Sequence, residues 1–185
     1  MRREHAWLVG ILAATALTLR ALGRVWWCKC GQPDLWTWDI WSMHNSQHLI
    51  DPYTFTHVIH GVLFYALFFL PLRKRSPGLG LGLVVAVALE SAWEVLENTN
   101  YMIERYREAT ISLDYVGDSI INSMGDILAC AGGYALAALV PVRISVAVVL
   151  LTELVLLMWI RDNLLLNVVM LVWPVEAIRR WQTGG

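Results

Sequence analysis

Residues 144–160 read ISVAVVLLTELVLLMWI, and this stretch decides the fold class. A helix of roughly 17–25 mainly apolar residues is needed to cross the ~30 Å hydrocarbon core of a bilayer. The stretch meets this requirement and carries one charged side chain, Glu153. It therefore predicts a transmembrane helix.

Similar apolar stretches lie on both sides, at residues 6–22, 54–72, 78–96, 116–140 and 164–175. At about 1.5 Å per residue the last is short for a full crossing, so we expect it to be tilted, half-inserted or extended by its flanks. The first follows a charged N-terminus and is open to interpretation as a signal peptide. Trp26 and Trp27 instead favour an uncleaved helix held at the membrane interface.

These stretches predict an all-α, polytopic transmembrane helix bundle of about six membrane segments, with an interfacial helix or loop between the first two. Residues 1–185 are expected to form one integral membrane domain. Hydrophobic residues make up 57% of the chain and charged residues 16%, whereas a soluble domain usually carries about 25% charged residues. The net charge of −1 argues against a nucleic-acid partner, because phosphate binding needs a basic face.

The distribution of Arg and Lys predicts the orientation. Loops on the cytoplasmic side carry an excess of these residues, and alternating spans place four basic groups on one side: residues 2–3, 73–75, 143 and 179–180. The sequence therefore predicts a multi-pass protein of the cell inner membrane with both termini in the cytoplasm. The Trp- and His-rich loop 24–53 and the loop 98–115 would then be non-cytoplasmic.

Ionisable side chains occur inside the predicted spans, where each costs about 2.5–3.5 kcal/mol on insertion scales. Side chains three or four residues apart lie on one face of a helix. Two acidic stripes follow this spacing: Glu90, Glu94 and Glu97 in the third span, and Asp114, Asp118, Asn122 and Asp126 at the start of the fourth.

Histidines follow the same spacing: His57 and His60 open the second span, and His44 and His48 precede it. In the predicted topology these histidines and both acidic stripes enter the membrane from the non-cytoplasmic side. We therefore expect them to meet in one water-accessible cavity in the outer half of the bilayer. Arg161 is expected on the same side as a source of countercharge.

Histidines and carboxylates with one open position are typical of a catalytic zinc site. We expect His57, His60 and Glu94 to bind a divalent metal such as zinc, with Asp118 as the alternative to Glu94. Glu90, Asp118 and Asp126 are the candidate catalytic acids and bases. The other polar residues are expected to support or bind: His44, His48, Glu97, Asp114, Asn122 and Arg161. A structural alternative is that the stripes only hold helices together.

Cys28 and Cys30 form a Cys-x-Cys pair in the Trp-rich loop. One intervening residue is tight for an unstrained disulfide, so free thiols, a strained bridge and soft-metal ligands all stay open.

Four stretches resemble the UPF0314 (DUF2585) family of bacterial integral membrane proteins: residues 44–61, 90–98, 104–110 and 114–123. The resemblance covers nearly the whole chain and implies a location in the cell membrane. It brings no established activity and assigns no catalytic residue.

Three functions fit the sequence. The first is a metal-assisted hydrolase or transferase acting on a lipid or lipid-linked substrate within the bilayer. The second is a non-catalytic membrane subunit or assembly factor with a membrane protein partner. The third is a proton-coupled transporter, because buried carboxylates are common in proton relays.

Overall fold

The computed structural model describes residues 2–69, 78–112 and 114–184. Its elements are α1 (Arg2–Ala21), α2 (Thr54–Phe64) with a following π-helical turn (Tyr65–Phe69), α3 (Gly78–Glu97), α4 (Asn100–Ala109), α5 (Ile120–Leu139), α6 (Val142–Ile160), α7 (Leu164–Val172) and α8 (Glu176–Thr183). The predicted all-α class is confirmed. Extended pairing among the described residues is limited to one isolated bridge, between Trp36 and Ile50.

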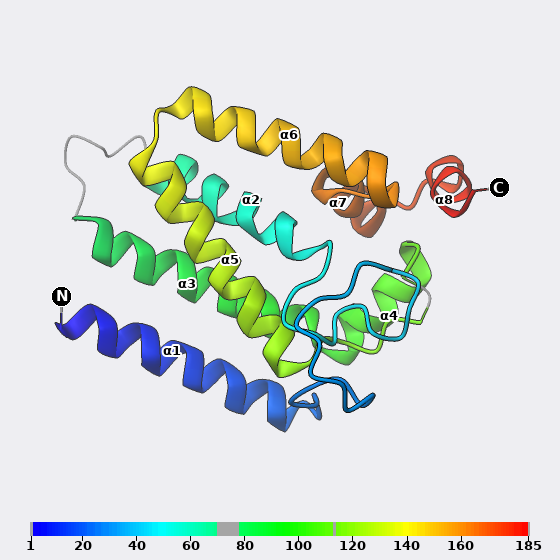
Figure 1. Ribbon diagram of the computed structural model, residues 1–185, viewed down its shortest axis with the longest axis horizontal. Helices are drawn as coiled ribbons and strands as arrows, with labels where there is room; N and C mark the ends of the chain where they lie inside the picture. The colour runs from blue at the N-terminus through cyan, green and yellow to red at the C-terminus, as the bar shows by residue number, and fades with distance from the viewer. Residues whose placement is uncertain (1, 70–77, 113, 185) are drawn as a thin grey trace.

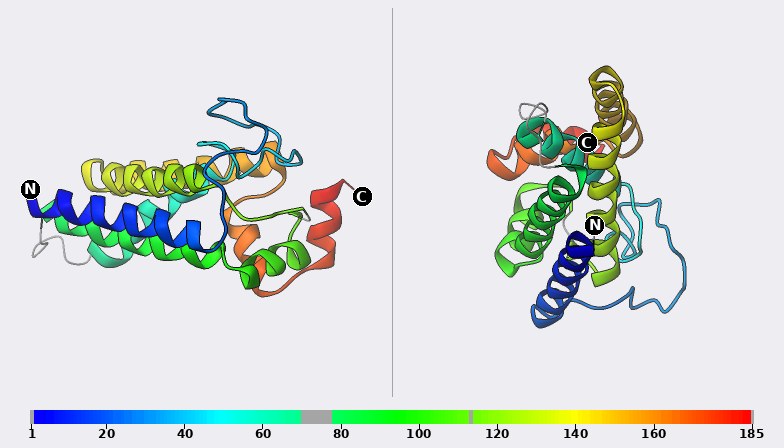
Figure 2. Two further views of the ribbon diagram at one scale, coloured as in Figure 1. Left: turned by 90° about the horizontal axis from the view of Figure 1, so that it is seen from below. Right: turned by 90° about the vertical axis from the view of Figure 1, so that its left-hand side faces the viewer.

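Helices α1, α2, α3, α5 and α6 run side by side (Figure 1), and the short helices α4, α7 and α8 gather at one end with the loop of residues 22–53. We call this the loop end of the bundle. The N-terminus lies at the opposite end and the C-terminus at the loop end, as the left view of Figure 2 also shows.

Helix α5 is the centre of the bundle and contacts α1, α2, α3 and α6. Two glycines set its distance from α2. A Cβ atom on Gly61 would lie 2.0 Å from the Cys130 carbonyl oxygen, and one on Gly133 would lie 2.0 Å from the Val58 carbonyl oxygen. Small residues at such contacts let helix backbones approach closely.

Polar side chains are buried inside this bundle while large apolar ones lie on its outside. Glu90, Glu94, Asn98 and Asn122 are all buried. The outer face of α6 exposes large apolar side chains, namely Val142, Ile144, Val146, Leu150, Leu151, Leu154, Val155, Met158 and Trp159. Apolar side chains such as Ile59, Ile127 and Leu156 are buried as well, but this much exposed apolar surface is unusual for a soluble bundle.

Among the described residues, two helices, α5 and α6, are long and apolar enough to cross a membrane. Helix α3 has the length, but it carries three charged side chains, Glu90, Glu94 and Glu97. The predicted end of the second span at residue 72 and the basic cluster at residues 73–75 lie outside the described residues.

Several predicted boundaries shift in the structure. Helix α5 begins at Ile120 rather than at residue 116, because the Ser119 hydroxyl accepts a hydrogen bond from the Asn122 amide and caps the helix. Residues 22–53 form turns and contain no helix, so the loop alternative is correct for this segment. The short last segment is helical only over the nine residues of α7.

Candidate metal-binding cavity

The site is built on the first turns of α2. The Asp51 carboxylate accepts hydrogen bonds from the backbone amides of Tyr53 and Thr54 at 2.8 and 3.1 Å, and so stabilises the start of this helix. His57 and His60 follow one turn later on one face. Both imidazoles reach the same carboxylate on α3, that of Glu90.

Glu90 lies between the two histidines. His57 Nδ1 is 2.5 Å from Glu90 Oε1, and His60 Nδ1 is 3.0 and 3.2 Å from the two oxygens of Glu90. His57 also lies near two further carboxylates, since its Nδ1 is 3.5 Å from Glu94 Oε1 and its Nε2 is 3.9 Å from Asp126 Oδ2. Helices α2, α3 and α5 each contribute to this group.

The carboxylates of this group are deeply buried and poorly satisfied. Glu90 is 0% exposed, Glu94 1% and Asp126 4%. Both oxygens of Glu94 and Oδ1 of Asp126 lack a hydrogen-bond partner among the described residues. Buried polar atoms without partners are rare in proteins, and an ion or water commonly explains them. Three acidic groups around two imidazoles also leave an excess of negative charge, which a cation would offset.

Two overlapping sets of side chains have ligand atoms close enough to share one ion. The first is His57, His60 and Glu90, and the second is His57, Glu94 and Glu97; within each set the ligand atoms lie within 4.8 Å of one another. Imidazole and carboxylate donors of this kind suit zinc and similar divalent metals. Of the predicted ligands, His57 belongs to both sets, whereas His60 belongs to the first and Glu94 to the second.

A cavity of about 500 Å³ opens onto this group. Its polar end is lined by His57, His60, Glu97, Asp118, Asn122 and Asp126. Its remaining walls come mostly from apolar side chains of α2, α3 and α7, namely Phe64, Leu89, Trp93, Leu96, Leu164, Val168 and Leu171. The cavity is therefore polar at the candidate metal ligands and apolar elsewhere.

Asp118 lines the cavity but has partners of its own. Asn98 Nδ2 donates to Asp118 Oδ2 at 2.7 Å, and the Tyr115 hydroxyl donates to both Asp118 oxygens at 3.0 Å. Asp118 precedes α5 and so lies outside the long helices. Burial raises the pKa of Asp118 to about 6, while the hydrogen bonds from Asn98 and Tyr115 act in the opposite direction. It is thus a carboxyl group suited to proton transfer near neutral pH.

The remaining candidates lie apart from the two histidines. Asn122 donates to the His48 carbonyl oxygen at 2.8 Å and so fixes the loop rather than a ligand. Asp114 is exposed. Arg161 is exposed and donates to the Trp181 carbonyl oxygen at 3.2 Å. Within the described ranges Arg161 forms no ion pair with the carboxylates, so it supplies no direct countercharge.

His44 and His48 lie beside Cys28 and Cys30 rather than beside His57. In the sequence, the two cysteines and the two histidines stand as separate pairs. Their presence in the same predicted loop is the one feature of the sequence that could have indicated a common site. The sequence pattern also indicated no role for Asn98, which lies 20 residues before Asp118, or for Tyr115, which lies three residues before it.

Comparison with known proteins places this architecture in context. A family model described as "Protein of unknown function (DUF2585)" matches residues 19–184. A UPF0314 protein of Sinorhizobium fredii is 50% identical over 99% of this chain and 93% of its own length, and one of Rhizobium meliloti is 49% identical over the same shares. One of Paracoccus denitrificans is 49% identical over 94% of this chain and 89% of its own. No solved structure matches.

Proposed function

This chain belongs to the DUF2585 (UPF0314) family of proteins of unknown function. The family assigns no activity, so a function has to be inferred from the geometry of the site. We propose that the protein is a multi-pass inner-membrane hydrolase or transferase. The proposed enzyme uses a divalent metal such as zinc at the His57 group and acts on a lipid or lipid-linked substrate. The observation that carries this proposal is the group of buried carboxylates without hydrogen-bond partners beside two histidines, at the end of an amphipathic cavity.

The membrane location is supported by the distribution of apolar surface. Only 17% of the most apolar stretch of α6 is buried within the protein. Trp7 and Leu17 of α1 and Leu165 and Val172 of α7 are exposed as well. Soluble monomers rarely expose contiguous apolar surface of this extent, because it favours association or membrane insertion. Contact with lipid tails accounts for it on several helices at once.

The proposed topology has five crossings, made by α1, α2 with its π-helical turn, α3, α5 and α6. Helix α7 has nine residues and would enter the bilayer only in part. An odd number of crossings agrees with termini at opposite ends of the bundle (Figure 1). Arg2 and Arg3 then place the N-terminus in the cytoplasm. The C-terminus lies outside, in place of the cytoplasmic position expected from Arg179 and Arg180.

Each side chain of the site has a distinct role in the proposed chemistry. His57, Glu94 and Glu97 would hold the metal with His60 beside them, and Glu90 orients both imidazoles by accepting from their Nδ1 atoms. A bound metal supplies Lewis acidity and a water of lowered pKa, near 7 in zinc enzymes. Asp126, whose Oδ2 lies 3.9 Å from His57 Nε2, and Asp118 would serve as the acids or bases along the cavity.

The cavity favours a lipid as the substrate class. Its apolar walls fit an acyl or polyprenyl chain, and its polar end fits the bond between that chain and a head group. A cavity of about 500 Å³ falls within the usual range for small-molecule sites, about 300–1,000 Å³. The substrate would reach it between α3 and α7, whose side chains line its apolar part.

A direct test is to incubate the detergent-purified protein with an inner-membrane lipid extract, with and without added zinc, and to follow the lipids by mass spectrometry. The proposal expects metal-dependent loss of one lipid class and appearance of its cleavage or transfer product. The His57→Ala variant should give no product, while Asp114→Asn, at an exposed position, should behave as wild type. Absence of any metal-dependent product, together with a stoichiometric co-purifying protein, would favour a non-catalytic subunit instead.

A further inference from the structure

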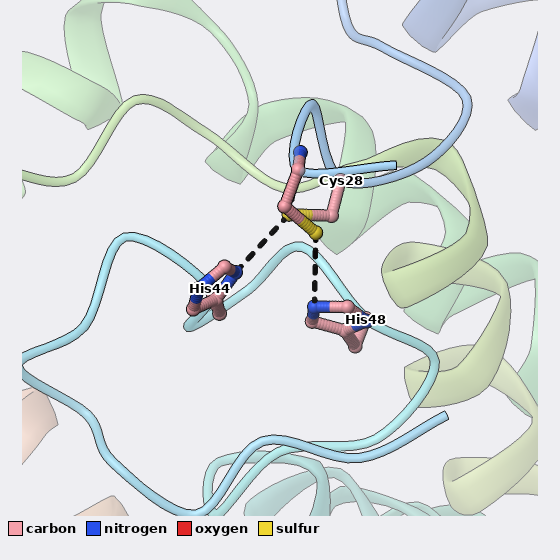
Figure 3. A group of neighbouring side chains, drawn as sticks. Cys28, His44 and His48 are labelled. Carbon is pink, nitrogen blue, oxygen red and sulfur yellow. Dashed lines mark hydrogen bonds between the residues drawn. The ribbon is translucent and has the colours of Figure 1, made fainter. Parts of the chain in front are cut away.

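The loop of residues 24–53 brings together four side chains that the His57 site does not use. Cys28 Sγ lies 3.4 Å from His44 Nδ1, and Cys30 Sγ lies 3.8 Å from His48 Nε2. One ligand atom from each of the four residues lies within 4.8 Å of the other three. Figure 3 shows the two imidazoles pointing from one segment of the loop toward the cysteine-bearing turn of the other.

These separations fit a tetrahedral zinc site. With Zn–S of about 2.3 Å and Zn–N of about 2.05 Å, a tetrahedral angle places sulfur and nitrogen about 3.6 Å apart. The two measured sulfur–nitrogen distances, 3.4 and 3.8 Å, lie on either side of this value. Two thiolates and two neutral imidazoles also balance the charge of Zn²⁺, which suits a partly buried position.

Hydrogen bonds around the group hold the ligands in a binding orientation. His48 Nδ1 contacts the Asp34 carbonyl oxygen, so this nitrogen carries the proton and the Nε2 lone pair faces Cys30. Metal-binding histidines commonly donate their second N–H to a carbonyl in this way. The backbone amides of Cys30 and Gln32 donate to the sulfurs of Cys28 and Cys30 at 3.4 and 3.5 Å. Such donors stabilise thiolates.

We propose that Cys28, Cys30, His44 and His48 form a closed structural zinc site that clamps the loop of residues 24–53. Both cysteines of the group are free thiols, and all four coordination positions are filled by protein. Closed four-ligand sites of this type are structural, whereas catalytic zinc sites keep a position open. This site is therefore distinct from the His57 group in ligands and in role.

The clamp would fix both halves of the loop onto the start of α5. The backbone amides of Ile120 and Ile121 donate to the carbonyls of Val25 and Trp26, just before the cysteines. Near the histidines, the Ser119 hydroxyl donates to the Gln47 carbonyl at 3.0 Å. Joining the two halves through zinc would hold Asn45 and Ser46, which line the cavity, in place. Its role is thus to support the cavity from the loop end.

The test uses the full-length protein purified in detergent under reducing conditions. Zinc X-ray absorption should detect two sulfur neighbours at about 2.3 Å. Replacing zinc by Co²⁺ should give the intense d–d bands of a tetrahedral site and a thiolate-to-cobalt charge-transfer band. We expect Cys28→Ser/Cys30→Ser to lose one equivalent of zinc and the charge-transfer band. Cys130→Ser, which alters a buried thiol on α5, should keep both, and His57→Ala/His60→Ala should keep the charge-transfer band.

Zinc without sulfur neighbours, or a Cys28–Cys30 disulfide in the purified protein, would overturn the proposal. If the double cysteine variant does not fold, the cobalt spectrum of the wild-type protein decides, since a spectrum without thiolate charge transfer excludes this site. Because the charge-transfer band needs sulfur ligands, and Cys130→Ser controls for the thiol beside Glu90, loss of the band in the double cysteine variant reports this site. Failure of the proposed activity at His57 would leave the result unchanged.

Discussion

Glu94 shows most clearly how a single side chain depends on a bound cation. Its two oxygens are buried beside His57 without a hydrogen-bond donor among the described residues. An uncompensated buried charge destabilises a fold. We expect Glu94→Gln to raise the melting temperature of the metal-free protein and to remove the part of its stabilisation by added zinc that comes from the His57 group. That stabilisation should reach about 2.7 kcal/mol in wild type at a metal concentration of 100 times Kd.

The matched control is Glu104→Gln, which removes an exposed carboxylate from α4. It should leave both melting temperatures at their wild-type values. Equal zinc stabilisation in Glu94→Gln and wild type would show that this carboxylate binds no metal.

Asp162 provides a pH dependence outside the membrane helices. It lies between α6 and α7, and burial raises its pKa from an ordinary 3.8 to about 6. Four groups that donate hydrogen bonds to its oxygens, led by the Asn163 amide and the Tyr53 hydroxyl, oppose this rise in pKa. Between these pH values the folded state holds a proton that the unfolded state has lost. Stability therefore falls as pH rises from about 4 to 6 and levels off above, by about 3 kcal/mol at most.

The measurement is the melting temperature of wild type and Asp162→Asn in detergent across this pH range. Other buried acids also titrate, so the informative quantity is the difference between the two proteins. We expect that difference to change between pH 4 and 6. A difference that stays constant with pH would refute the raised pKa.

The packing of α2 on α5 makes a prediction at the level of helices. A methyl group on Gly133 would overlap the Val58 carbonyl oxygen, whereas one on Gly132 meets nothing within 4 Å. Gly133→Ala should therefore lower the free energy of unfolding by about 1–3 kcal/mol. Gly132→Ala should be neutral or stabilising by up to about 1 kcal/mol through helix propensity. Thermal unfolding in one detergent compares the two, and equal melting temperatures would contradict the close approach.

Helical spacing in the sequence predicted the main features of α2 and α3. His57 and His60, three residues apart, do share a face, and Glu90 and Glu94 do face them. The spacing could not show that Asp118 would turn to Asn98, because that contact depends on the extended segment before α5. Nor could it show that Arg161 would contact the carbonyl of Trp181 in α8.

At the scale of the molecule, the proposed five crossings predict that the termini lie on opposite sides of the membrane. A fluorescent protein that folds only in the cytoplasm should be bright at the N-terminus and dark at the C-terminus. A phosphatase that is active only outside should be active at the C-terminus. Fluorescence from both fusions would restore the six crossings and two cytoplasmic termini expected from the basic residues.

The cavity could be predicted only in outline. The sequence placed the polar residues at one end of a bundle, and the cavity does open at that end. It did not give the packing order of the helices, which decides that α7 supplies apolar wall residues. It also kept Cys28 and Cys30 apart from His44 and His48, because the turns that join them have no periodic signal.

The most direct test of the metal site in the cavity is the metal content of the purified protein, measured by plasma mass spectrometry. Wild type and the His57→Ala/His60→Ala variant are compared at equal protein concentration. The proposed site predicts that the variant holds about one equivalent of zinc, or of another transition metal, less than wild type. The difference between the two proteins is informative whatever the loop cysteines bind. Identical metal content in the two proteins, after growth with supplemented metals, would contradict a metal site at His57.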